Sequence, residues 1–470
     1  MKNSLCLIVS LFVALPALAW DWWPLPMAAP DTCHDRLFYV GQINILSSSG
    51  TEAPYLLQTN RHGTISSAPH SGSLALGIIK PATRPNRWFD YDFAAVLTGQ
   101  LQSSGTLGTG YFEQLYAHAR LYIVDLTIGI RPHSFAADPE LTMGHFLFSD
   151  NAHPVPRISI GFDCWTPIPG LYGYLDIKGG LTHGWLDDNN PFVSRTYLHH
   201  AYVAGRVGGK LPLNISYEFH HAAQWGGHSA TAGNLGNRIS DFWHILTAQK
   251  SGGTTRNETL GREGNHIGMQ QLTVTAKGTD WHIDFYWQYI NEDGPLRFIG
   301  GGKNNRDGIW GAHFEQTRWP YLQAFTLEFT NTTDQSGPFH DKGGIVFGGD
   351  DSYFANGVYA QGWTYFSRTI GLPLITQMNN RVMAGYFGVK GDIYGFRYRF
   401  VAQHTENWGT YRMPSRSHNT ALMLEVQKHV EKAWGMDFSI SLASDIGNQF
   451  GNTFGALITI RKQGLITTIQ

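Results

Sequence analysis

The chain has 470 residues, of which 42% are apolar, 13% are aromatic and only 15% are charged, whereas soluble domains carry about 25% charged residues. Its formal net charge of −2 gives no basic surface of the kind that nucleic-acid binding requires, so we expect no nucleic-acid partner. The length allows two or three soluble domains or one large one.

The first residues, MKNSLCLIVSLFVALPALA, have the pattern of a secretory signal peptide. Lys2 supplies the positive charge, an apolar run follows up to Leu15, and Ala17 and Ala19 fit the small-x-small cleavage site. We therefore expect residues 1–19 to be removed and residues 20–36 to form a short periplasmic segment. No later stretch has 18 apolar residues, so the mature chain has no predicted transmembrane helix.

Alternation of apolar and polar residues with a period of two dominates the rest of the chain and predicts an all-β fold. In WHIDFYWQYI, for example, Trp281, Phe285 and Trp287 share one face, while His282 and Asp284 share the other. In chain order we expect eighteen strands, at 37–46, 73–80, 86–101, 110–119, 121–131, 156–164, 172–184, 197–207, 211–223, 266–277, 280–290, 305–315, 320–330, 380–389, 392–404, 418–429, 434–444 and 453–462.

An all-β chain with this alternation is either a soluble sandwich with an apolar interior or a membrane barrel with an apolar exterior. The strand lengths, about 9–12 residues, suit a tilted crossing of a bilayer. Short and long connections also alternate from end to end, as they do between the periplasmic turns and extracellular loops of outer-membrane barrels. We therefore predict a closed antiparallel transmembrane β-barrel over residues 37–470, located in the outer membrane, with Phe285, Trp287 and Tyr289 facing lipid or its interface.

Two features of this barrel leave alternatives open. The longest connection, 331–379, is an extra hairpin, a loop folded into the lumen, or two further strands. Inward-facing charges, including Glu218, Arg399 and Glu425, form either a selectivity lining or a salt-bridged plug. Because both signs occur, we favour mutual pairing inside a blocked or narrow lumen. The chain ends LITTIQ rather than on an aromatic residue, unless the last strand stops near Ile460 and the tail is extra.

The two cysteines outside the signal peptide are both expected at the periplasmic end. Cys33 precedes the first strand, and Cys164 ends the sixth strand, which returns to the same side. An exported protein meets an oxidising compartment, so we predict a Cys33–Cys164 disulfide that holds the N-terminal segment beneath the barrel.

Several segments resemble the Wzi family of capsule assembly proteins, in particular its Bacteroidetes-type members. The most specific are QWGG with the later FW of SDFW, then SGPFH and GWTYFSRTIG; others include PYLLQTNRHGTIS, SDNAHPVPRISIG and DIKGGLTHGWLDD. The resemblance covers nearly all of the mature chain. It implies an eighteen-stranded outer-membrane barrel that helps to hold capsular or other surface polysaccharide on the cell. The short segment before the first strand departs from better-known members, which have a periplasmic helical bundle there.

The long connection 224–265 carries the residue types that recognise sugars: aromatic faces for C–H groups, and amides and carboxylates for hydroxyls. Similar residues occur at 187–190 and at Asn407 and Trp408. The alternative for each residue is a packing role, in which the tryptophans hold the loop against the barrel. The polysaccharide-binding candidates in the long connection are Gln224, Trp225, Asn234, Asn237, Asp241 and Trp243.

Two histidine doublets, His199-His200 and His220-His221, lie on the arms of one expected hairpin near the outer rim. One histidine from each arm could share a face and bind zinc. No third ligand is evident, so we interpret the doublets as a polar lumen row and predict no metal site.

An enzymatic function has little support. The acid pairs Asp187-Asp188 and Asp350-Asp351 near the mouth could imitate an outer-membrane protease, but such pairs in Gly-rich loops are more often solvated or calcium-binding. We expect a monomeric, non-enzymatic protein without a cofactor, whose partners are outer-membrane lipids and a surface polysaccharide. The alternative function is a diffusion porin for small solutes.

Overall fold

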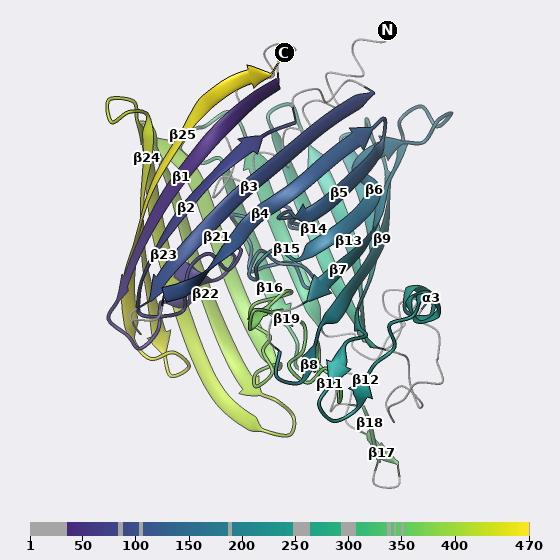
Figure 1. The fold of residues 1–470 in the computed structure, drawn as a ribbon. Coiled ribbons are helices and arrows are strands. Elements are labelled where there is room, and N and C mark those ends of the chain that lie inside the picture. Colours follow the sequence, from purple (N-terminus) through teal and green to yellow (C-terminus); the bar gives the residue numbers. More distant parts are fainter. Residues whose placement is uncertain are drawn as a thin grey trace.

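The computed structural model describes residues 35–82, 88–102, 107–186, 190–247, 264–292, 307–335, 340–342, 345–348 and 352–469. Eighteen strands form one closed antiparallel barrel, in which each strand pairs with the barrel strands before and after it in the chain (Figure 1). The last strand closes on the first, and their register runs from the Asp35–Ile469 pair to the Ser48–Gly455 pair.

The barrel strands are β1 (Asp35–Ser48), β2 (His70–Lys80), β3 (Phe89–Gln102), β4 (Leu107–Leu121), β5 (Val124–Ile130), β6 (Pro156–Pro167), β7 (Leu175–Leu186), β9 (Thr196–Val207), β10 (Leu213–Trp225), β13 (Asn265–Lys277), β14 (Trp281–Glu292), β15 (Gly308–Gln316), β16 (Ala324–Asn331), β21 (Val382–Ile393), β22 (Phe396–Gly409), β23 (Pro414–Val430), β24 (Met436–Gly447) and β25 (Thr453–Ile469). The predicted closed barrel and its strand number are confirmed. Most strand boundaries differ from the predicted ones by a few residues, and two of the differences have clear reasons. Strand β22 begins later than predicted, because Tyr394 and Gly395, with φ of 55° and 76°, form the turn before it. Strand β25 continues to Ile469, so the alternative that it stops near Ile460 is wrong.

The connections fall into two sets at opposite ends of the barrel. One end, at the top of Figure 1, has the turns 81–88, 122–123, 168–174, 208–212, 278–280, 317–323, 394–395 and 431–435, and β25 finishes there. The other end has longer loops, among them 49–69, 131–155, 226–264 and 332–381. Tight turns mark the periplasmic end of such barrels, and longer loops mark the extracellular end. None of the helices in the described part of the chain is long and apolar enough to cross a membrane.

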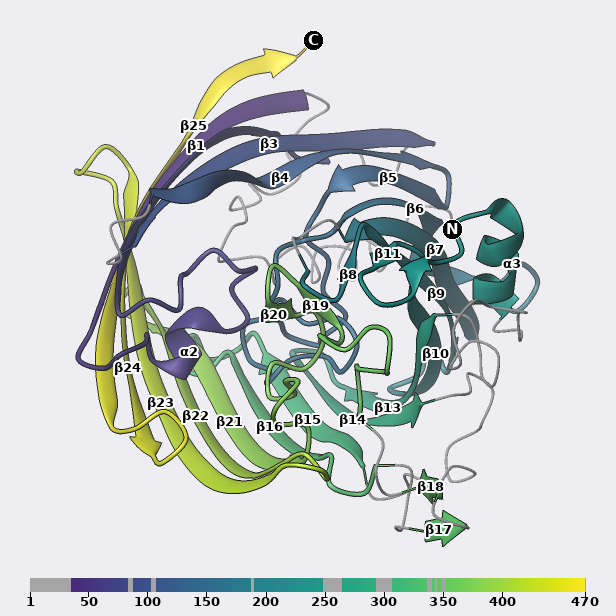
Figure 2. The same ribbon diagram turned by 60° about the horizontal axis from the view of Figure 1, so that its bottom comes forward.

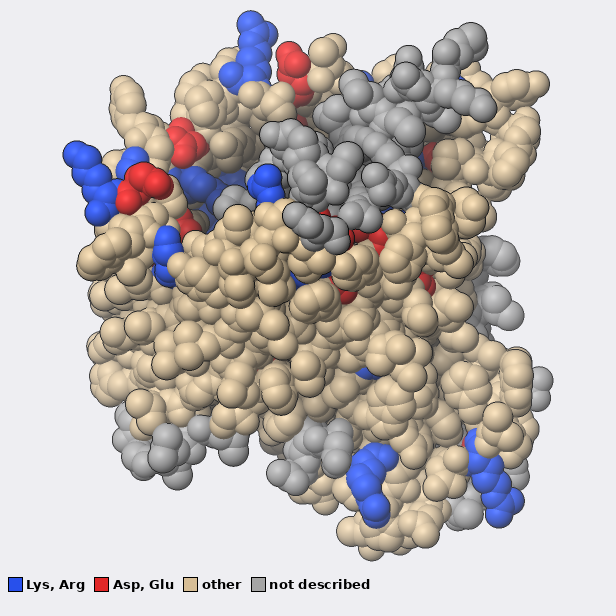
Figure 3. All heavy atoms as spheres, turned by 45° about the horizontal axis from the view of Figure 1, so that its top comes forward, with Lys and Arg blue, Asp and Glu red and all other residues tan. Residues whose placement is uncertain are grey.

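The wall is apolar outside and polar inside. Leu76, Leu327 and Ile440 point outward with 57%, 50% and 50% of their surface exposed, whereas the inward-facing Asn44 and Gln403 are buried. Figure 3 shows a wall almost without charged side chains, with Lys, Arg, Asp and Glu gathered toward the rims. An exterior of this kind is stable only in hydrocarbon, so the barrel lies in the outer membrane.

Exposed aromatic residues form a ring at the periplasmic end, where Trp and Tyr are favoured at the membrane–water interface. They lie in or beside the short turns: Trp88, Tyr122, Tyr172, Tyr174, Trp281, Trp319, Tyr321, Tyr394 and Trp434.

Strand β14 corrects one part of the prediction for the wall. Phe285 is 53% exposed on the outer face, as predicted, and Trp287 stacks on Trp310 with ring centroids 6.2 Å apart. Tyr289 is fully buried, so the prediction that it faces lipid or the interface is wrong. It lies near the extracellular end of β14, where its ring packs against that of Trp287.

A charge on the outer face should destabilise the folded barrel. We expect Leu76→Arg, near the middle of β2, to lower the free energy of unfolding in lipid vesicles by about 2–4 kcal/mol, since Arg must enter hydrocarbon. The control Tyr172→Arg, in a periplasmic turn, should cost no more than about 1 kcal/mol. Denaturant unfolding followed by tryptophan fluorescence measures both, and equal costs would contradict the assigned membrane zone.

Candidate functional site

Three extracellular segments fold back into the lumen, and we call 49–69, 131–155 and 352–381 the plug segments. Figure 2, which brings the extracellular end forward, shows the short helix α2 (Tyr55–Gln58) and the hairpin of β19 (Thr364–Tyr365) and β20 (Arg368–Thr369) inside the ring of strands. The plug segments share one apolar core in which the following side chains are fully buried: Leu57, Phe146, Leu147, Trp363 and Leu372.

The longest connection therefore combines two of the three structures considered for it. It contains a hairpin, β17 (His340–Lys342) with β18 (Ile345–Gly348), and it contains the third plug segment. Apart from Asn331, which ends β16, no described part of it joins the barrel sheet, so the alternative of two further barrel strands is wrong.

Polar side chains of the wall bind the backbone of the plug. The buried Glu328 of β16 accepts hydrogen bonds from the Met143 N–H at 2.5 Å and from the Thr142 hydroxyl at 2.8 Å. The Gln288 Oε1 accepts from the Phe146 N–H at 3.0 Å. The plug segments are thus fixed to the wall by buried hydrogen bonds, which are costly to break because each leaves an unsatisfied partner.

The plug segments also bind one another. The Trp363 indole N–H donates to the Leu147 carbonyl at 2.7 Å. The Arg368 guanidinium donates to the carbonyls of Gln58 and Ile65 at 2.9 and 2.6 Å. Through these two side chains the third segment holds the first and the second in place.

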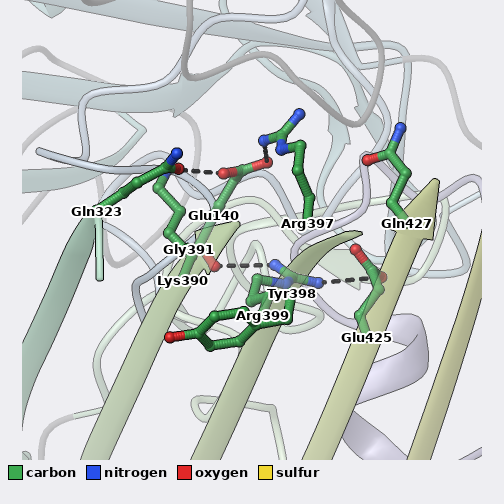
Figure 4. Close-up of a pocket in the computed structure, with 9 residues that line it drawn as sticks. All are labelled: Glu140, Gln323, Lys390, Gly391, Arg397, Tyr398, Arg399, Glu425 and Gln427. Carbon is green, nitrogen blue, oxygen red and sulfur yellow. Dashed lines mark hydrogen bonds and ion pairs between the residues drawn. The ribbon is translucent and has the colours of Figure 1, made fainter. Parts of the chain in front are cut away.

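A cluster of charges fixes the plug at the base of the lumen, and Figure 4 shows the residues that line a small pocket beside it. Lys390 of β21 lies between two carboxylates of the second plug segment, with its Nζ 2.8 Å from the Asp138 Oδ2 and 2.6 Å from the Glu140 Oε2. Arg399 of β22 donates to the Glu140 carbonyl oxygen at 2.9 Å. We call Asp138, Glu140 and Lys390 the base latch.

The predicted pairing of lumen charges is confirmed. Glu425 of β23 lies 3.2 Å from the Arg61 Nη2 of the first plug segment and 3.6 Å from the Arg399 Nη2. Glu218 of β10 lies 3.0 Å from the Lys178 Nζ. These ion pairs therefore hold the first plug segment to the wall and link strands of the wall to one another.

At the extracellular rim, Asp307 anchors the start of the third plug segment. Its carboxylate accepts hydrogen bonds from the Tyr353 hydroxyl at 2.8 Å, the Asn331 amide at 3.0 Å and the Asp334 N–H at 2.9 Å. Burial raises the pKa of the Asp307 carboxyl to about 7.

The predicted sugar-binding residues divide into two buried residues and four that are exposed or half-buried. Gln224 and Trp225, at the end of β10, are buried. The Trp225 ring packs against Tyr197 and against Phe242 of the helix α3 (Ile239–Thr247), with centroids 4.9 and 5.9 Å apart. Trp225 thus supports α3, which Figures 1 and 2 show outside the ring of strands.

The other four candidates lie on or just before α3. Trp243 is 57% exposed, and Asn234 and Asn237 are also exposed. Asn234 lies in β12 (Gly233–Asn234), which pairs with β11 (His228–Ser229), and β11 in turn pairs with β8 (Val193–Ser194). The Asp241 carboxylate accepts the Arg238 N–H at 2.7 Å at the start of the helix. These four residues are therefore carried by a folded loop.

Other predicted positions have structural partners or fall outside the described residues. Asn190 Oδ1 accepts the N–H groups of Phe192 and Val193, and Asn407 is buried with its amide donating to Gln449. Residues 187–189 and 350–351 lie outside the described residues, as do the signal peptide and Cys33. The Cys164 sulfur lies 3.4 Å from an Arg120 nitrogen at the periplasmic end, and the disulfide stays a prediction.

The histidine doublets share faces as predicted, one pair on each face of the wall. The His200 Nε2 lies 3.1 Å from the His220 Nδ1, beside Phe135 of the second plug segment. His199 and His221 lie on the other face, with ring centroids 5.4 Å apart, where Phe242 of α3 packs against the His199 ring and His266 lies beside His221. The lumen row thus accounts for His200 and His220 only.

No protein-family model and no curated protein sequence matches this chain. Among solved structures it is similar to Wzi of Escherichia coli, an outer-membrane protein involved in group 1 capsule assembly and described as a carbohydrate-binding β-barrel, with 13% identity, a TM-score of 0.61, and coverage of 90% of this chain and 84% of that one. This protein is an outer-membrane β-barrel. Acinetobacter baumannii OccAB2 (10% identity, TM-score 0.49, 92% and 98% covered) and Pseudomonas aeruginosa OprD (10%, 0.47, 92% and 96%) also match. The likeness to Wzi concerns the fold alone, and membership of its family remains a prediction.

Proposed function

We propose that this protein acts as a single barrel that binds a surface polysaccharide at its extracellular face and helps to retain it on the cell. The observation that carries the proposal is the filled lumen. Wall side chains that would line an open channel, such as Gln288, Glu328 and Gln403, are at most 6% exposed. A lumen occupied by the protein's own loops is poorly suited to solute diffusion, which disfavours the porin alternative.

The extracellular face offers chemistry that suits a carbohydrate. The exposed indole of Trp243 presents a flat aromatic face, and the amides of Asn234 and Asn237 can donate to and accept from hydroxyl groups. The net charge near zero suits a ligand held mainly by stacking and hydrogen bonds. The shared fold with a carbohydrate-binding barrel is consistent with this use of the outer face.

Removal of the exposed indole should weaken polysaccharide binding. We expect Trp243→Ala to lower the affinity of the purified, detergent-solubilised protein for capsular polysaccharide from the source cells by about tenfold, which equals about 1.4 kcal/mol. Calorimetric titration measures the affinity of each variant. The control is Trp434→Ala, which removes a 79% exposed indole from a periplasmic turn and should leave the affinity unchanged.

The two possible failures of this experiment test the binding function and the position of the binding surface separately. If the wild-type protein binds no surface polysaccharide, the proposed function is wrong. If it binds and the two variants bind equally well, the polysaccharide contacts a surface other than α3.

A further inference from the structure

Strands β14 and β15 place four ionisable side chains together near the periplasmic end of the lumen wall. Asp284 lies opposite His313, and His282 lies opposite Glu315, and these are successive pairs on one face of the antiparallel register. Directly opposed residues on one face have Cβ atoms about 4.5–5.5 Å apart. The side chains of both pairs can therefore reach a common point.

The distances within this group are too long for hydrogen bonds. The His282 Nε2 lies 3.7 Å from the Glu315 Oε2 and 3.8 Å from the Asp284 Oδ2, and the His313 Nε2 lies 4.0 Å from the Glu315 Oε2. One ligand atom each of His282, His313 and Glu315 lie within 4.8 Å of one another. Tetrahedral zinc, with bonds of about 2.0–2.1 Å, holds its ligand atoms about 3.4 Å apart. Small side-chain rotations would bring these atoms to that spacing.

His313 is the residue that distinguishes a metal site from two ordinary ion pairs. Its side chain is 1% exposed, and its Nε2 makes no hydrogen bond with any described residue. Its Nδ1 lies 2.8 Å from the Thr326 Oγ1 of β16, which fixes the ring. Metal-binding histidines are held in this way by an outer partner while the second nitrogen points at the ion. A buried ring nitrogen without a hydrogen bond is otherwise costly.

We propose that His282, His313 and Glu315 bind a divalent transition-metal ion, Zn²⁺ in the first instance, with Asp284 or a water molecule as the fourth ligand. Two imidazoles and one carboxylate suit zinc, whereas Mg²⁺ and Ca²⁺ take oxygen ligands. The ion would clamp β14 to β15 on the lumen wall near its periplasmic end. This proposal is independent of polysaccharide binding.

The test uses untagged, full-length protein in detergent, stripped of metal with a chelator and titrated with ZnCl₂ in a calorimeter. The expected result is one equivalent of bound zinc that excess Mg²⁺ or Ca²⁺ does not displace. We expect Thr326→Val to weaken binding by about 10-fold to 100-fold, as loss of an outer partner does, and His313→Ala and Glu315→Gln to weaken it further. Stoichiometric Co²⁺ should show the visible absorption of a tetrahedral site, and Glu315→Gln should reduce it.

The matched control is His429→Ala. His429 is an exposed periplasmic histidine with its ring nitrogens 2.8 and 3.0 Å from Asp437 and Glu431, so it shares the carboxylate surroundings but lacks a second histidine. Its loss should leave zinc binding unchanged. The proposal is overturned if the wild-type protein binds no zinc, or if folded Glu315→Gln, a near-isosteric change, binds as tightly as the wild type. Retained heat-modifiable mobility in electrophoresis shows that each variant is folded.

Discussion

Replacement of residues 132–154 by a short Gly/Ser linker should open the plugged lumen and turn the barrel into a conducting pore. Eighteen-stranded barrels are wide enough to leave an aqueous channel when nothing fills them. Here the second plug segment contributes Phe146 and Leu147 to the lumen core and carries the carboxylates of the base latch. We expect stable single-channel steps in planar bilayers from the shortened protein and none from the wild type.

The control for this experiment is another extracellular loop, one that lies outside the lumen. Replacement of residues 237–247, which include α3, by the same linker should leave the barrel closed, because α3 packs on the outer side of the wall. Stable conductance from the wild-type protein would contradict the plugged lumen and favour the porin alternative.

Loss of the cation in the base latch should release the second plug segment without unfolding the barrel. Lys390→Met leaves Asp138 and Glu140 buried, at 6% exposure each, with their shared cation removed. Removal of one partner from a buried ion pair costs about 3–5 kcal/mol. We expect backbone hydrogen exchange in 131–155 to accelerate strongly, while the barrel strands keep their protection.

A rescue variant distinguishes charge from packing. Lys390→Met combined with Asp138→Asn and Glu140→Gln leaves no uncompensated carboxylate in the latch, so most of the lost protection should return. If the triple variant exchanges as fast as Lys390→Met alone, the latch acts through shape, and the electrostatic account of it is wrong.

Strand alternation predicted the wall well, because every barrel residue faces either lipid or lumen and the two environments demand opposite chemistry. Leu327 and Glu328 are neighbours in sequence and differ accordingly, at 50% and 6% exposure. Tyr289 shows where the rule ends. Tyr289 is fully buried near the extracellular end of its strand, so an outward position there does not imply exposure.

The plug segments were harder to predict, because their partners are distant in sequence. Nothing near Asp138 or Glu140 indicates that Lys390, some 250 residues later, lies beside them. The sequence contained a partial signal. LTMGHFLF and IGLPLI are apolar stretches inside long extracellular connections, and such stretches are unfavourable in an exposed loop, which indicates that they are buried. The cluster of His282, His313 and Glu315 was hidden for a similar reason, since it depends on the register of two strands.

Retention of polysaccharide on the cell tests the central claim most directly. A strain that lacks this protein should make as much surface polysaccharide as its parent but lose most of it from the cell-bound fraction to the medium, and the wild-type gene should restore it. Unchanged cell-bound polysaccharide in the deletion strain would contradict the account.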